Sequence, residues 1–130
     1  MFKISPVGDS DLAKEFASAC GIDYIDGAFL YAATDMESGK LLAVSQFEIL
    51  GEYGHIYAMR SVAEIDDFEL MFILGRQTMN FIDLCGSHKC RASADGTDNS
   101  LLRAIGFKET DEGFFADMTG FFDGSKCAGH

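Results

Sequence analysis

The chain has 130 residues, of which 48% are hydrophobic, and its formal net charge of -11 follows from 21 acidic and 10 basic side chains. Its length suits one compact domain, and this hydrophobic content excludes an intrinsically disordered chain. No apolar run is long enough to cross a bilayer, and the negative field repels phosphate backbones and anionic lipid. We therefore expect neither nucleic acid nor membrane as a partner.

The first half of the chain predicts a helix and four strands. A short strand at 2–5 precedes a helix that Asp9 or Ser10 can cap and that runs to about Cys20. Alternating apolar residues then predict a three-stranded antiparallel meander, with strands at 28–36, 41–50 and 55–63.

The strand at 55–63 is expected to lie in the centre of the sheet. Strict alternation places Ile56, Ala58, Arg60 and Val62 on one face and Tyr57, Met59 and Ser61 on the other, so both faces carry apolar residues.

A long helix is predicted next, because Asp66 and Glu69 form a capping pattern and apolar spacing continues to about Leu84. The expected core stripe comprises Phe68, Met71, Phe72, Gly75, Met79 and Ile82. Three further apolar residues, Leu70, Ile73 and Leu74, lie outside this stripe. They indicate either deeper burial of the helix or a homodimer contact.

The last third predicts a strand at 89–94, parallel to the strand at 55–63 through a right-handed crossover. A short helix at 99–105, capped by Asp98 or Thr97, and a hairpin of 107–110 and 114–119 complete the fold. The class is α+β with three layers: a mixed, mostly antiparallel sheet of six to seven strands, helices on both faces and a central parallel pair. We expect one domain at 1–122 and a flexible tail at 123–130.

Three matching features accompany this order of elements: Val62 at the end of the fourth strand, Gly86 after the long helix, and Ile105-Gly106-Phe107 after the short one. Together they resemble the GNAT superfamily of acyl-CoA-dependent N-acetyltransferases over most of the chain. The resemblance implies that the fourth and fifth strands splay apart and that acetyl-CoA is the cofactor. Backbone groups of Met59, Ser61 and Val62 would then contact its pantetheine arm and acyl carbonyl.

The resemblance also implies a glycine-rich loop that binds pyrophosphate at the start of the long helix. The segment from Glu64 to Met71 instead carries four carboxylates, with no glycine and no basic residue. Because amides at a helix start bind anions and nearby carboxylates repel them, this degenerate loop disfavours ordinary CoA binding.

Two further positions concern acid and base chemistry. Where many GNAT members carry a proton-donating Tyr, four residues before the Gly of Gly-Phe, this chain has Leu102. The Asn often found near the start of the short helix corresponds to Asp95, or is displaced to Asn99. Glu48, on the third strand, is a candidate general base, although a solvated strand position is the simpler interpretation.

The four cysteines form no C-x-x-C pair, and the run from Cys85 to Cys90 lacks the second ligand cluster that a zinc site needs, so we expect no metal. A cysteine enzyme that uses Cys90 with His55 or His88 has no support from spacing.

The segment 1–6 lacks the features of a secretory signal, and we therefore expect a cytoplasmic location.

Two hypotheses remain open. The first is an acyl-CoA-dependent N-acetyltransferase, which acetyl-CoA would stabilise and whose acceptor is unspecified. The second is a catalytically silent GNAT-fold module that binds a small ligand or a protein partner through the notch between the strands or through the apolar surplus of the long helix.

Overall fold

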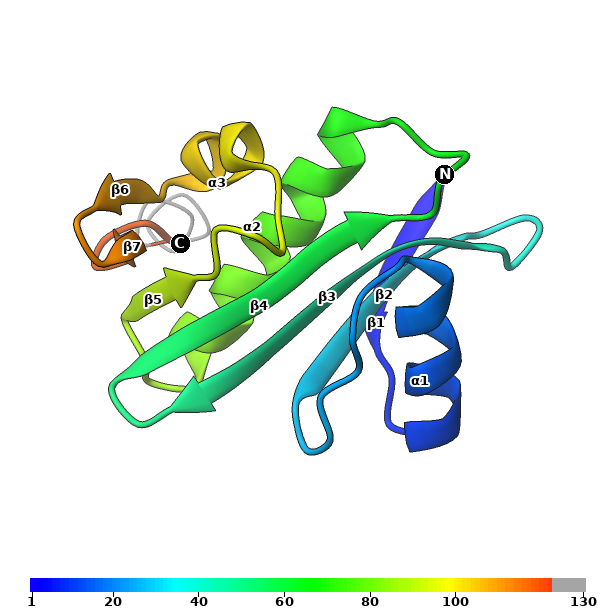
Figure 1. Cartoon of the computed structure of the whole chain (residues 1–130), viewed down its shortest axis with the longest axis horizontal. Coiled ribbons are helices and arrows are strands. Elements are labelled where there is room, and N and C mark those ends of the chain that lie inside the picture. Colours follow the sequence, from blue (N-terminus) through cyan, green and yellow to red (C-terminus); the bar gives the residue numbers. More distant parts are fainter. Residues whose placement is uncertain (123–130) are drawn as a thin grey trace, which may run out of the picture.

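The computed structural model describes residues 1–122, so the predicted tail at 123–130, with Cys127 and His130, lies outside the described residues. The elements follow the expected order (Figure 1). The described elements are β1 (Phe2–Pro6), α1 (Ser10–Ala19), β2 (Phe29–Asp35), β3 (Leu41–Leu50), β4 (Tyr53–Ser61), α2 (Phe68–Leu84), β5 (Lys89–Ala92), α3 (Asn99–Ile105), β6 (Lys108–Thr110) and β7 (Gly113–Asp117).

All seven of these strands form one sheet, in the order β1-β2-β3-β4-β5-β7-β6. Strands β4 and β5 pair in parallel, and every other neighbouring pair is antiparallel. The predicted mixed sheet with a central parallel pair is thus confirmed. The long helix α2 is the crossover that the parallel pair requires.

Helices cover both faces of the sheet, as expected. Helix α1 packs on one face against Leu30 and Val44, whereas α2 packs on the other face against their neighbours Ala33 and Ala43. Alternation along β2 and β3 sends successive side chains into these two layers. Helix α3 joins α2 in the larger core on the second face. None of the described helices has the length and apolar character needed to cross a membrane.

Strand β4 contains one extra residue, which corrects the predicted faces of this strand. In the β3–β4 ladder, Gln46 pairs with Ala58 but Phe47 pairs with Ile56, so Tyr57 is left without a partner as a β-bulge. As a result Ile56 and Met59 both enter the core beneath α2. The prediction that they lie on opposite faces was wrong, because strict alternation cannot account for an inserted residue.

Two details of α2 also differ from the prediction. Its N-cap is Asp67, whose Oδ1 accepts a hydrogen bond from the Leu70 amide at 3.1 Å, and not Asp66. Leu70 and Leu74 are fully buried against β2 and β3, while Phe68 is 52% exposed. The deeper-burial interpretation of the two leucines is therefore correct, because α2 contacts the sheet across a wider face than the predicted stripe.

The assignment of the cap can be tested with two neighbouring carboxylates. Asp67→Ala should lower the free energy of unfolding by about 1 kcal/mol, because an N-cap acceptor is lost. Asp66→Ala, the matched control, should change it by less than about 0.5 kcal/mol, as expected of a surface position. Urea denaturation followed by circular dichroism measures both. A larger loss for the Asp66 variant would contradict the assignment.

Candidate functional site

The two parallel strands separate after a short run. Pairing of β4 with β5 ends at Ile56 and Ala92, and the Ser93 amide makes one more bond to the Ile56 carbonyl at 3.0 Å. Strand β4 continues to Ser61, so its last residues have no neighbouring strand on that side. The segment 93–98, which links β5 to α3, crosses this opening.

Contacts between 95–97 and 57–60, which we call the latch, close the opening between the strands. The Met59 amide donates to Thr97 Oγ1 at 3.0 Å and to the Gly96 carbonyl at 3.3 Å. Arg60 Nη2 donates to the Asp95 carbonyl at 3.2 Å. Gly96 lies so near to β4 that an added Cβ would stand 2.0 Å from the Tyr57 carbonyl oxygen. Only glycine permits this approach of the two backbones.

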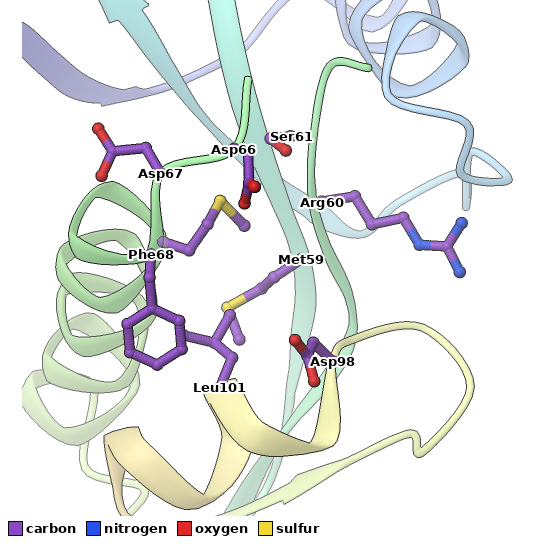
Figure 2. A pocket seen from close by; sticks show the side chains of 9 residues that line it. Met59, Arg60, Ser61, Asp66, Asp67, Phe68, Asp98 and Leu101 are labelled. Atoms are coloured by element: carbon purple, nitrogen blue, oxygen red, sulfur yellow. The ribbon is translucent and has the colours of Figure 1, made fainter. Parts of the chain in front are cut away.

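A first cavity of about 320 Å³ lies on the α2 side of the latch, between the starts of α2 and α3 (Figure 2). Met59, Phe68 and Leu101 converge on it as an apolar floor. Ser61 also lines it and donates its hydroxyl to the Ile65 carbonyl. The third residue predicted to contact a cofactor, Val62, is absent from the lining, and its amide donates to the Leu42 carbonyl of β3 at 2.9 Å. The cofactor role of these residues stays a prediction.

Negative side chains surround the first cavity. Asp66, Asp67 and Asp98 line it. Two of these carboxylates already accept hydrogen bonds from amides at helix starts. Asp67 accepts from the Leu70 amide, and Asp98 accepts from the Ser100 amide at 2.9 Å. Arg60 is the single basic residue in the lining, but its guanidinium points away from Asp66 and Asp67 (Figure 2). The cavity therefore offers an apolar floor under a negative rim.

A second cavity of about 280 Å³ lies on the α1 side of the latch. Its walls come from the segment after α1, from β3 and β4, and from the segment 93–98. Gln46, which is 1% exposed, donates to the Asp23 carbonyl at 2.8 Å and accepts from the Ile25 amide at 2.9 Å. This side chain thereby fixes the wall formed by residues 23–25. The latch separates the two cavities.

A polar cluster borders the second cavity on the same face of the sheet. The Tyr57 hydroxyl donates to Glu48 Oε1 at 2.6 Å, and this bond, with burial, raises the pKa of Tyr57 to about 12. His55 Nε2 lies 2.9 Å from Ser93 Oγ. Burial first, and the charge of Arg91 second, hold the pKa of His55 below its usual value. The sequence analysis considered Glu48 as a base but did not connect it with Tyr57.

The residues that the structure adds to the site could not be recognised from local spacing. His55 and Ser93, like Met59 and Thr97, are 38 residues apart in the sequence, and only the crossover brings them together.

Leu102, where the resemblance implies a Tyr, is fully buried in the core. Cys90 is also buried, and burial raises its pKa to about 12, which argues against a nucleophilic thiolate.

No protein-family model matches the sequence, and no curated protein matches it. Solved structures do match the fold. An IAA acetyltransferase from Bacillus cereus is 13% identical, with a TM-score of 0.71 over 85% of this chain and 79% of that one. A GNAT family acetyltransferase from Brucella melitensis, solved with acetyl-CoA, is 13% identical, with a TM-score of 0.68 over 90% and 88%.

The ribosomal-protein-S18-alanine N-acetyltransferase from Escherichia coli is 14% identical, with a TM-score of 0.65 over 88% of this chain and 91% of that one. At such identities the similarity establishes the fold alone. The fold is GNAT-like, and the expected resemblance is confirmed at that level. Activity has to be argued from the site.

Close backbone packing at the latch predicts a large effect of one methyl group. Gly96→Ala should lower the free energy of unfolding by about 2 kcal/mol or more. The added Cβ would clash with the Tyr57 carbonyl oxygen, which is a backbone atom and cannot move away as a flexible side chain could. Gly8→Ala is the matched control, since an added Cβ there meets no atom within 4 Å. Thermal and urea unfolding compare the two. Equal stability of both variants would show that the latch is not formed.

The environment of His55 predicts its titration. Its folded pKa lies below the unfolded value of 6.5, so the unfolded chain binds its proton more readily. This histidine therefore destabilises the fold as the pH falls below about 6.5. An NMR titration of the ring Cε1–H should give a midpoint below 6.5, and Arg91→Gln should move it upward. A midpoint above 6.5 in the wild type would contradict this environment.

Proposed function

We propose that this chain is a GNAT-fold binding domain that takes a small ligand in the first cavity and does not transfer acetyl groups from acetyl-CoA. The latch is the observation that carries this proposal. The Met59 amide, which faces the opening between β4 and β5, already donates to Thr97 and Gly96. A thioester carbonyl would have to displace both acceptors to receive this hydrogen bond.

The latch also separates the two groups that a transfer reaction must bring together. Acyl transfer needs the attacking and accepting atoms about 3 to 3.5 Å apart. One cavity lies on the α2 side of β4 and the other on the α1 side, with Gly96 and Thr97 between them. A donor in the first cavity and an acceptor in the second would thus lie on opposite faces of β4, apart from the close approach that transfer needs.

Charge argues against a diphosphate at the start of α2. Asp67 already occupies the Leu70 amide, and each carboxylate near a bound phosphate costs about 1 kcal/mol or more at short range. A ligand without phosphate avoids this cost. The floor formed by Met59, Phe68 and Leu101 suits an apolar body, and the negative rim suits an uncharged or cationic head. The lining therefore favours a small ligand that has an apolar body, an uncharged or cationic head and no phosphate.

The second candidate function is N-acetyl transfer, and two observations favour it. The fold is that of acetyltransferases, several of which were solved with CoA or acetyl-CoA. The Tyr57–Glu48 pair also borders the second cavity, where Glu48 could accept a proton from an amine. This candidate requires the latch to open.

A thermal-shift titration with acetyl-CoA distinguishes the two candidates. A ligand that binds only the folded state at about 100 times its dissociation constant adds about 2.7 kcal/mol of stability. We expect no change in Tm for the wild type up to millimolar acetyl-CoA. A rise of several degrees would overturn the proposal in favour of the transferase.

Thr97→Val provides a sharper comparison, because valine keeps the shape of the side chain and removes the nearer of the two acceptors of the Met59 amide. The variant should be less stable by about 1 kcal/mol, since a buried amide loses a partner. Under the proposal, acetyl-CoA still does not raise the Tm of this variant, because the carboxylates at the start of α2 are unchanged. Tighter binding by this variant than by the wild type would support the transferase with a closed latch.

A further inference from the structure

The face of β4 and β5 opposite α2 carries a group of polar side chains that extends beyond the Tyr57–Glu48 pair of the transfer candidate. Helix α1 lies over β1 to β3 and leaves this face of β4 and β5 open (Figure 1). His55 and Tyr57 of β4, Ser93 at the end of β5 and Glu48 of β3 meet there. His55 and Tyr57 are two residues apart and share this face by ordinary strand alternation, with ring centroids 4.6 Å apart.

We infer that Ser93 and His55 form a nucleophile–base pair that hydrolyses short-chain carboxylic esters in the second cavity. A serine becomes nucleophilic when a neighbouring base accepts its proton and a third group orients that base. His55 Nε2 stands 2.9 Å from Ser93 Oγ, and Glu48 is the residue directly opposite His55 in the β3–β4 ladder. Ser93 and His55 thus make the side-chain contact that such a pair requires, and Glu48 lies on the neighbouring strand.

The position of Ser93 distinguishes it from the other hydrogen-bonded serines of the sheet layer. Ser45 accepts from Thr78 inside the core, and Ser87 donates to the Gly51 carbonyl. Ser61 lines the first cavity but donates to the Ile65 carbonyl, whereas Ser93 lines the second cavity with its hydroxyl beside the His55 imidazole. A volume of about 280 Å³ restricts that cavity to small acyl groups.

The charges around His55 suit a base that works near neutral pH. Partial burial first, and Arg91 of β5 second, lower the pKa of His55 and favour the neutral imidazole, whose Nε2 can accept the serine proton. Glu48 opposes Arg91 and favours the imidazolium once the proton has moved. Tyr57 occupies one oxygen of Glu48 and holds the carboxylate beside the histidine.

The reaction balances without a coenzyme. Ser93 Oγ forms a bond to the ester carbonyl carbon while its proton passes to His55 Nε2. The bond from that carbon to the alcohol oxygen breaks, and the alcohol leaves with the proton from His55. Water, deprotonated in turn by His55, attacks the acyl carbon. The bond from that carbon to Ser93 Oγ breaks, His55 returns the proton to Oγ, and the carboxylic acid is released. The net reaction is ester plus water to acid plus alcohol.

A fluorophosphonate probe tests the nucleophile on the unmodified protein. The probe phosphonylates an activated serine with loss of fluoride, and trypsin should release Ser93 within the peptide 92–103, because Arg91 and Arg103 flank it. We expect one adduct per chain, on Ser93, with fragmentation separating it from Ser100 and Thr97. An adduct on another residue, or none after prolonged incubation, would overturn the proposal. This readout needs no variant and is independent of the response to acetyl-CoA.

Hydrolysis of p-nitrophenyl acetate tests the base. Ser93→Ala should reduce the rate to that of buffer, and His55→Gln should reduce it about 100-fold, the usual contribution of a general base. His88→Gln is the matched control, since His88 pairs with Asp83 on the surface and should leave the rate unchanged. The wild-type rate should fall at acidic pH as His55 is protonated. Equal rates in the wild type and the Ser93 variant, with both folded by circular dichroism, would refute the assignment.

Discussion

The extra residue in β4 is the constraint on which the site depends. With Tyr57 inserted opposite the Gln46–Phe47 step, Ile56 and Met59 both enter the α2 core, whereas regular alternation would place them on opposite faces. A bulge also increases the local twist, which accounts for the loss of β5 pairing directly after Ile56. Both cavities and the latch border this point of the strand.

The order and type of the elements could be predicted from the sequence, because each rests on local physics. Alternation marked the meander, apolar spacing marked α2, and Asp9 and Asp98 were among the expected helix caps. The start of α2 was misplaced by one residue because Asp66 and Asp67 are equally good caps in isolation. The packing of Leu70 and Leu74 on the sheet decides between them, and that information is not local.

The site was less predictable, for a related reason. The resemblance placed Met59 and Ser61 at the opening between the strands, and both line the first cavity. Nothing in the sequence around Thr97 or Ser93 indicated a partner, because each meets β4 only through the crossover that α2 makes. The bulge was equally hidden, since Tyr57 is an ordinary strand residue and no glycine or proline marks it.

Packing and chemistry have separate requirements in this fold. Leu102 is fully buried beside Ile105 and Phe107. Burying a leucine side chain stabilises the folded state by about 1.5 to 3 kcal/mol, and this stabilisation does not require a hydroxyl group at the position. The core can therefore be complete while the position of a proton donor is filled by an apolar residue. In the same way, Asp67 completes α2 as a cap whether or not any phosphate binds there. The stability of this GNAT-like sheet thus rests on core and cap residues, and its open face is free to carry chemistry of its own.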